Sequence, residues 1–281
     1  MKIIVCIAVA VIILSAVIWF KIPYSPLKKD FSNDNIVLKE KSVLYRSDEV
    51  FKESDFAVMP SAIQKYVGNA GYIGTPKMNS LHMEYLDVDF KQGKNGPNLK
   101  IDYIQNNYVK EPARMAMILS SMFGIPFQGY DYYSNGVGGM KGVIAKLLTL
   151  FDQRGHEMDV ACLATFLAES VFFPSVLLQD YISLEEVNDH QVRATITFRD
   201  QKASGIFTFN EKYEMTSFTT KDRAVVNTDG TTEYVPWTAA CDNYIMGADG
   251  IKRPTTFKAI WNYTDGDFVY FDGQISKIDY E

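Results

Sequence analysis

The chain of 281 residues contains only three cysteines and three histidines, the side chains on which most zinc sites depend. Such sites need several of these ligands at short spacing. His82, His156 and His190 lie far apart, and no second histidine follows His156-Glu157 at the spacing of a metalloprotease helix. The sequence therefore predicts no metal site, and we expect no cofactor.

Positive charge is also scarce. Lys and Arg number 28 against 34 Asp and Glu, the net charge is -6, and no run is rich in basic residues. Proteins that bind nucleic acids gather basic side chains on one surface. We therefore expect no nucleic-acid partner.

Two common enzyme motifs are missing. No Gly-x-Ser-x-Gly sequence is present to form a nucleophile elbow. The glycine-rich residues 136–142 lack the Gly-Lys-Ser/Thr ending of a phosphate-binding loop, and alternating residues follow them. We interpret this run as a hairpin.

What the sequence does contain is one long apolar run. Residues 3–20 carry no charge and, at 1.5 Å per residue, would span about 27 Å as a helix, close to the hydrocarbon thickness of a bilayer. No small-x-small cleavage site follows. We predict that residues 1–21 are an uncleaved transmembrane signal anchor, which contacts the membrane through residues 3–20.

The sequence contains two opposing signals for the side of the membrane on which the C-terminal domain lies. Lys21, Lys28 and Lys29 follow the run and only Lys2 precedes it, which favours a cytoplasmic domain. A two-residue leader before an apolar run is, however, the usual form of an exported signal anchor. We expect a single-pass protein of the cell membrane whose C-terminal domain is extracytoplasmic.

The remainder divides into two parts. Residues 22–55 mix prolines with charged residues and show no sustained periodicity, which predicts a tether. Residues 56–281 contain no repeat or linker and are predicted to form one β-rich domain. Within it, helical spacing predicts a short helix at 60–67 and an amphipathic helix at 158–171.

Alternation of apolar and polar residues predicts the strands. The clearest run is 192–198, where Val192, Ala194 and Ile196 share one face. Comparable runs occur at 81–90, 97–105, 113–120, 127–134, 140–149, 204–209, 215–223, 234–244, 255–263 and 268–280.

Asp-Gly pairs at 229–230, 249–250, 265–266 and 272–273 predict tight turns, or a bulge in one case. About eleven antiparallel strands result. The predicted fold class is α+β, a large curved antiparallel sheet wrapped around the central helix and the short N-terminal helix.

Several residues are candidates for function. Met115, Met117 and Leu119 alternate along one strand, where flexible thioethers suit either a core or a cavity for acyl chains. On the central helix the corresponding candidates are Leu163, Phe166 and Leu167.

Glu169 follows them in apolar surroundings, where an unpaired carboxylate would be costly if buried. Arg154 and Arg193 are its candidate partners. Glu169 is also the one candidate for a catalytic group, although a structural ion pair is the simpler interpretation. Cys162 and Cys241 could form a disulfide or remain buried thiols, and we favour the thiols.

Certain stretches resemble an uncharacterised bacterial family. Residues 59–71 (MPSAIQKYVGNAG) are similar to its opening LPxxVQRYLxxAG, and residues 154–159 (RGHEMD) with 165–174 (TFLAESVFFP) are similar to its ARGPEMD and RYLAExxWFP signature, with Phe172 in place of the signature Trp. The resemblance covers residues 59–281 and implies a domain of unknown function without an assigned catalytic residue. The expected architecture also resembles the lipoprotein-carrier fold, a curved half-barrel whose concave face holds acyl chains.

These observations favour a membrane-tethered extracytoplasmic domain that binds a hydrophobic small molecule, a lipid or a lipoprotein acyl chain between sheet and helix. The first alternative is an envelope enzyme that uses Glu169 as general acid or base. The second is a structural or signalling domain with a protein partner in the envelope.

Overall fold

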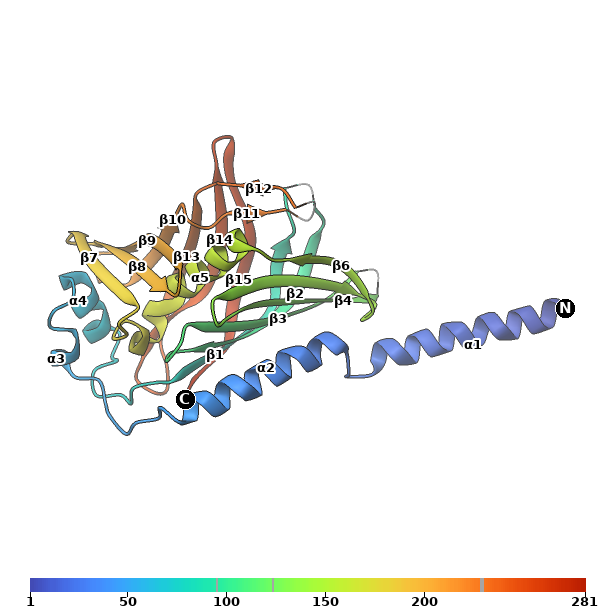
Figure 1. The fold of residues 1–281 in the computed structure, drawn as a ribbon, viewed down its shortest axis with the longest axis horizontal. Helices are drawn as coiled ribbons and strands as arrows, with labels where there is room; N and C mark the ends of the chain where they lie inside the picture. The colour runs from blue at the N-terminus through green and yellow to red at the C-terminus, as the bar shows by residue number, and fades with distance from the viewer. Residues whose placement is uncertain (95, 123, 228–229) are drawn as a thin grey trace.

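Thirteen antiparallel strands form one curved sheet that encloses a helix (Figure 1). The computed structural model of the chain describes residues 1–94, 96–122, 124–227 and 230–281. The helices are α1 (Lys2–Lys21), α2 (Pro26–Val43), α3 (Glu53–Phe56), α4 (Ser61–Asn69), α5 (His156–Glu169), and the 3-10 helices η1 (Ser170–Phe172) and η2 (Pro174–Val176).

The strands are β1 (Ser80–Lys91), β2 (Asn98–Tyr108), β3 (Ala113–Met122), β4 (Ile125–Ser134), β5 (Val137–Ile144), β6 (Leu148–Gln153), β7 (Ile182–Asn188), β8 (Gln191–Phe198), β9 (Gln201–Phe209), β10 (Met215–Thr220), β11 (Val225–Val226), β12 (Thr232–Glu233), β13 (Trp237–Met246), β14 (Lys252–Tyr263) and β15 (Gly266–Tyr280). The sheet order is β6-β5-β4-β3-β2-β1-β15-β14-β13-β10-β9-β8-β7, and β11 pairs separately with β12. The predicted α+β class and the curved antiparallel sheet are confirmed.

The curvature follows from the position of α5. This helix contacts β3, β4 and β5 in one half of the sheet and β8 and β9 in the other half. The alternating side chains of β8 supply part of the core, because Val192, Ala194 and Ile196 are fully buried while Arg193 is exposed. The sheet therefore wraps around α5, with its apolar face on the inside.

A close approach between α5 and β5 explains the glycine-rich run. Asn135 and Gly136 have φ of 55° and 78° and form the tight turn between β4 and β5. At Gly138 a β-carbon would lie 2.9 Å from the Cys162 β-carbon of α5. The run is thus a hairpin, as predicted, and the absence of a side chain at Gly138 lets α5 pack directly on β5.

The strand count of eleven is wrong, because β6 and β7 bring the main sheet to thirteen. The single strand predicted over 140–149 is two strands, since the chain reverses at Ala145 and Lys146, which have φ of 54° and 64°. β7 carries Glu185 and Glu186 at the sheet edge, and most of its side chains are exposed. Such a strand lacks the alternation that a half-buried strand shows.

The helices and most turns agree with expectation. α4 and α5 lie within two residues of the predicted 60–67 and 158–171. Asp249-Gly250 and Asp265-Gly266 lie at turns, whereas Asp272-Gly273 lies inside β15. Asp229, from another predicted turn, is outside the described residues. Cys162 and Cys241 are buried free thiols.

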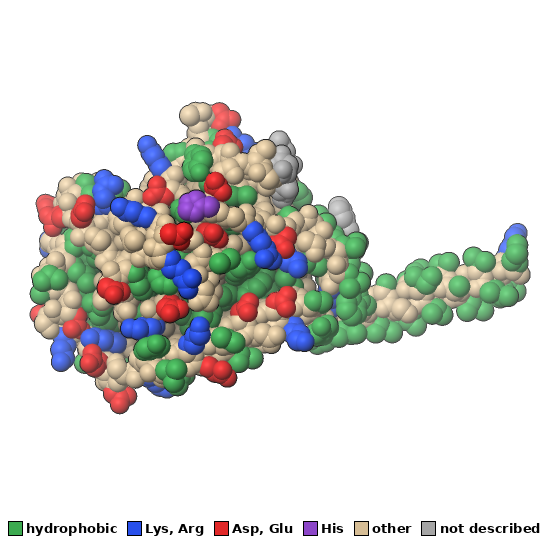
Figure 2. All heavy atoms as spheres, viewed as in Figure 1, with side chains coloured by type: hydrophobic (Ala, Val, Ile, Leu, Met, Phe, Trp, Pro, Cys, Tyr) green, Lys and Arg blue, Asp and Glu red, His purple; other side chains and the backbone are tan. Residues whose placement is uncertain are grey.

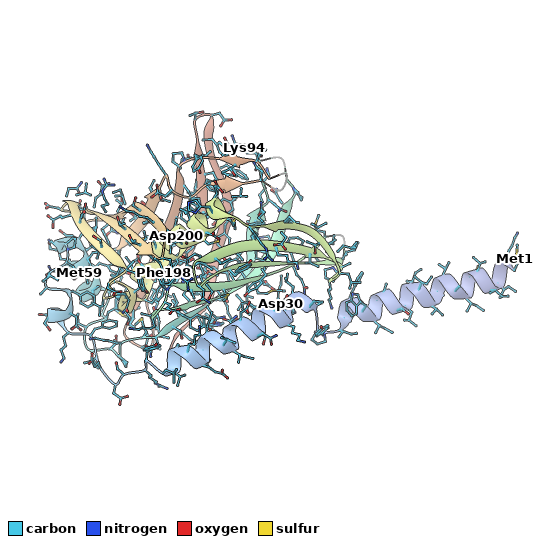
Figure 3. The ribbon with its side chains drawn as sticks, viewed as in Figure 1. Met1, Asp30, Met59, Lys94, Phe198 and Asp200 are labelled. Atoms are coloured by element: carbon cyan, nitrogen blue, oxygen red, sulfur yellow. The ribbon has the colours of Figure 1, made fainter. Side chains whose placement is uncertain are left out.

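Residues 22–55 are more ordered than a tether. The Ser25 hydroxyl accepts a hydrogen bond from Lys28 N at 3.2 Å and caps α2, which begins at Pro26. Leu27, Phe31 and Leu38 pack on the outer face of the sheet. Asp30 therefore lies beside the sheet in Figure 3, whereas Met1 lies at the far end of α1.

Helix α1 differs from the rest of the molecule. Its mean hydropathy reaches 3.1 over 18 residues, none of which is buried, and it is the one helix of the described residues that is long and apolar enough to cross a membrane. Figure 2 shows it as an apolar rod that projects from a body with mixed surface charge.

Candidate functional site

A cavity of about 1080 Å³ lies between α5 and the concave face of the sheet. Its size is that of pockets that hold organic ligands. Most of its lining is aromatic or aliphatic and comes from both halves of the sheet. These residues include Tyr85, Phe90, Ile118, Met140, Leu150, Phe151, Met158, Phe172, Met215, Trp237, Phe257, Trp261, Phe268, Tyr270 and Phe271.

Loops supply further lining residues. They come from the β1–β2 loop with Lys94, from residues 224–227, which include the short strand β11, and from the β14–β15 turn with Asp265. Lys94 Nζ lies 2.7 Å from Asp265 Oδ1 and 3.7 Å from the centre of the Tyr263 ring. Figure 3 marks Lys94 at this end of the sheet. An exposed ion pair thus joins two of these loops.

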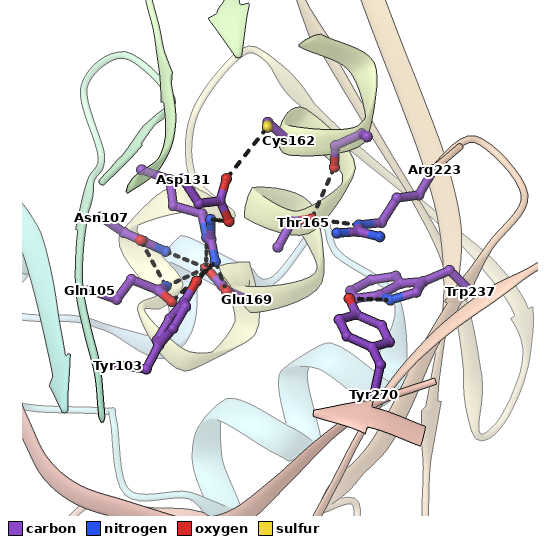
Figure 4. A network of polar contacts seen from close by, with 12 residues as sticks. Tyr103, Gln105, Asn107, Asp131, Cys162, Thr165, Glu169, Arg223, Trp237 and Tyr270 are labelled. Carbon is purple, nitrogen blue, oxygen red and sulfur yellow. Dashed lines mark hydrogen bonds and ion pairs between the residues drawn. The ribbon is translucent and has the colours of Figure 1, made fainter. Parts of the chain in front are cut away.

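One wall carries a buried polar group, which we call the Arg114 cluster (Figure 4). Arg114 on β3 reaches Asp131 on β4 through Nη1 at 2.7 Å and Glu169 at the end of α5 through Nε at 3.3 Å. Gln105 Nε2 and Asn107 Nδ2 donate to Glu169 Oε2 at 2.6 and 2.7 Å. Arg114 also donates to the Tyr103 hydroxyl. One buried cation therefore serves two carboxylates.

Burial shapes the protonation of this cluster. It raises the pKa of Glu169, while Arg114 and the two amide donors oppose the increase. Burial alone would lower the pKa of Arg114, but Tyr103, Asp131 and Glu169 together raise it well above its usual value. Arg114 stays cationic and fixes the carboxylates in place.

The cluster is poorly arranged for catalysis. Arg114, Gln105 and Asn107 already occupy the oxygens of Glu169. The nearest thiol, Cys162, lies 3.7 Å from Asp131 Oδ1, and burial raises its pKa well above its usual value. A protonated thiol is a weak nucleophile. The cluster is better suited to hold strands and helix together at the cavity wall.

A second polar feature lies across the cavity. Arg223 lies close to two indole rings, with its guanidinium carbon 4.7 Å from the centre of Trp237 and 4.9 Å from that of Trp261. Its Nε donates to Thr165 Oγ1 of α5 at 3.0 Å. Trp237 Nε1 in turn donates to the Tyr270 hydroxyl at 3.0 Å, as Figure 4 shows.

The structure separates the residues that the sequence singles out. Met115 and Met117 are buried with Leu119 packed against them, but they lie under α2 on the outer face of the sheet and do not line the cavity. The reason is the alternation of β3, which places Arg114, Ala116 and Ile118 inside and the methionines outside.

The helix candidates also have different positions. Leu163, Phe166 and Leu167 are fully buried in the main core but are not part of the cavity lining, whereas Glu169 is. Arg154 is exposed and pairs with Asp152 at 2.8 Å, so it is not the partner of Glu169. Arg154 comes directly after β6 in the chain, and it does not line the cavity.

Sequence reasoning missed the residues that carry the charge of the site, Arg114, Asp131 and Arg223. Arg114 did offer a signal, because it occupies an inner position of a strand that is otherwise apolar from Ala113 to Leu119. A charge at such a position requires a buried partner. Nothing in the local sequence predicted that Trp237 and Trp261 would both contact Arg223.

Comparison with solved structures gave eight similar chains, two of which are as follows. A putative outer membrane lipoprotein-sorting protein domain from Vibrio parahaemolyticus is 11% identical, with a TM-score of 0.41 over 78% of this chain and 91% of that one. A DUF1329 family protein from Desulfovibrio piger is 10% identical, with a TM-score of 0.42 over 79% and 92% of the two chains.

No curated protein matches the sequence. The model of a family of unknown function, DUF6920, matches residues 57–280. This match covers both of the motifs on which the resemblance rests. The chain belongs to this family, DUF6920.

Proposed function

We propose that this protein is a membrane-tethered domain that binds a hydrophobic ligand, a lipid or an acyl chain, in the cavity between α5 and the sheet. The observation that carries the proposal is the cavity itself, because a volume of about 1080 Å³ remains open although aromatic rings surround it. Protein cores are normally packed without such space. Transfer of an acyl chain into it would be driven by burial of apolar surface.

The polar residues at the cavity wall favour ligand binding over catalysis as the function of the cavity. The Arg114 cluster is saturated with internal hydrogen bonds and ion pairs. It therefore keeps the cavity wall rigid, and a preformed cavity binds with little loss of conformational entropy.

The N-terminal helix supports the location. Trp19 Nε1 donates to Ala145 O at 2.9 Å, and Lys146 Nζ donates to the carbonyls of Trp19 and Ile22 at 2.9 and 2.5 Å. These bonds attach the end of α1 to the β5–β6 turn. Tryptophan is common at membrane interfaces, so this turn is proposed to lie at the bilayer surface.

Exposed leucines lie next to the same turn. Leu147, Leu148 and Leu150 are 66%, 65% and 53% exposed. Leu150 also lines the cavity. We include in the proposal that these side chains contact lipid and that the domain lies on the extracytoplasmic side.

Energy transfer from tryptophan to a dansylated undecanoic acid tests the binding. The chain has three tryptophans, so in a Trp19→Phe background both remaining donors line the cavity. The full-length chain would be held in an amphipathic polymer, with empty polymer as the blank. Saturable transfer is expected.

Ala239 and Ala259 lie opposite each other on β13 and β14 and line the cavity. Ala239→Phe should block the transfer by filling space, whereas Ala57→Phe, at an exposed position, should leave it intact. Absence of transfer in the unblocked chain, or unchanged transfer after Ala239→Phe in a folded chain, would disprove the proposed function.

A further inference from the structure

Arg223 is a cation at the cavity wall that no carboxylate neutralises among the described residues. Two other arginines with little exposed surface do have acidic partners, Arg114 with Asp131 and Arg253 with Asp249. The adjacent carboxylate, Asp222, is engaged elsewhere, because its Oδ2 accepts from Ser204 N and Oγ at 2.7 and 2.9 Å.

The surroundings hold the Arg223 side chain in one orientation. The indoles of Trp237 and Trp261 lie near its guanidinium carbon, and Thr165 accepts from Nε. Within the described residues, Nη1 and Nη2 have no hydrogen-bond partner. A guanidinium with two unused donor nitrogens matches the two oxygens of a carboxylate or phosphate.

We infer that Arg223 binds the anionic head group of an amphiphile whose apolar tail occupies the cavity. This inference rests on the proposed function and narrows its ligand to a carboxylate or phosphate with an attached hydrocarbon chain. The tail is required because the surface around Arg223 is aromatic, from Trp237 and Trp261 to Tyr270 and Phe268.

The Arg114 cluster determines the orientation of the ligand in the cavity. Arg114 is shared by Asp131 and Glu169, so this wall carries two carboxylates for one cation. An anionic head group is repelled there and attracted at Arg223. The ligand therefore binds with its head at Arg223 and its tail along the aromatic lining.

The test compares dansylated undecanoic acid with its methyl ester, which has the same tail without the charge, again by energy transfer in the Trp19→Phe full-length chain. The acid is expected to bind about tenfold more tightly than the ester, the usual contribution of one charge-assisted contact. Arg223→Gln should abolish this preference, so that acid and ester bind this variant with equal affinity, and Arg223→Lys should keep part of the preference. Arg154→Gln, which removes an exposed arginine outside the cavity, is the matched control and should keep all of it.

The outcomes are distinguishable. Equal affinity of the unsubstituted cavity for acid and ester would overturn the role of Arg223 even if Arg223→Gln failed to fold, while leaving the proposed function standing. A preference that survives in folded Arg223→Gln would do the same. Displacement of the probe by sodium acetate, a carboxylate without a tail, would show that the site binds simple anions. This result would overturn the inference that the ligand is an amphiphile. Failure of both probes to bind would instead count against the proposed function.

Discussion

Arg114 Nε lies 3.3 Å from both carboxylate oxygens of Glu169, although 55 positions separate the two residues in the sequence. The contact joins the C-terminal end of α5 to β3, and the ion pair of Arg114 with Asp131 extends it to β4. The cluster therefore fixes the helix against the half of the sheet that carries the β5–β6 hairpin.

Replacement of Arg114 should be strongly destabilising. Arg114→Met leaves Glu169 and Asp131 without their shared cation, and loss of one partner of a buried ion pair costs about 3–5 kcal/mol of unfolding free energy. Denaturant unfolding of the full-length chain, followed by tryptophan fluorescence, measures the change. Arg154→Met at the exposed pair with Asp152 should change the value by less than about 0.5 kcal/mol. Similar losses in both variants would contradict a structural role for the Arg114 cluster.

The pH dependence of stability should report on Glu169. Burial raises its folded-state pKa above 4.5, so the folded state binds this proton more tightly than the unfolded state. The corresponding stabilisation is complete below about pH 4.5 and is lost as pH rises through the raised pKa. Unfolding free energies of the unsubstituted chain and Glu169→Gln, measured between pH 4 and 8, should therefore diverge, with Glu169→Gln gaining relative stability at higher pH. A constant difference across this range would show that the pKa of Glu169 is not raised.

Lipid contact at the β5–β6 turn can be tested by photocrosslinking. Benzoylphenylalanine at Leu148, which is 65% exposed beside the end of α1, should form adducts with phospholipid when the full-length chain is in liposomes. The same group at Val187, which is 47% exposed at the opposite edge strand β7, should not. Equal adduct yields at the two positions would contradict the proposed membrane surface.

The side of the membrane can be determined with a single cysteine. Val58 is 96% exposed, whereas Cys162 and Cys241 are buried and Cys6 lies in α1. In intact cells, Val58→Cys should react with a membrane-impermeant maleimide if the domain is extracytoplasmic. Labelling that appears only after the cells are lysed would place the domain in the cytoplasm.

The sequence predicted the sheet well where its inner and outer faces differ. On β8 the alternation of Val192, Ala194 and Ile196 with polar residues follows directly from one buried and one solvated face. On β3 both faces are buried, because α2 covers the outer one, so alternation could not indicate which side chains face the cavity. This is why Met115 and Met117 appeared to be cavity candidates.

The polar residues of the site were harder to predict for a different reason. Arg114, Asp131 and Glu169 come together only when the sheet curls around α5, and no local spacing encodes that closure. Helix α2, in contrast, left a usable signal. Ser25-Pro26 is a typical helix start, although the residues after it lack a regular apolar stripe.

Helix α2 also limits how far the domain can travel. Its Tyr130–Asp34 and Lys39–Glu281 contacts, both 2.6 Å, hold it along the sheet, and only Ile22 to Ser25 separate it from α1. A link of four residues spans at most about 14 Å, so under the proposed function, in which α1 is embedded in a bilayer, the domain stays next to that bilayer. A ligand bound in the cavity would have to be delivered or collected at that same membrane, by lateral encounter with whatever supplies it.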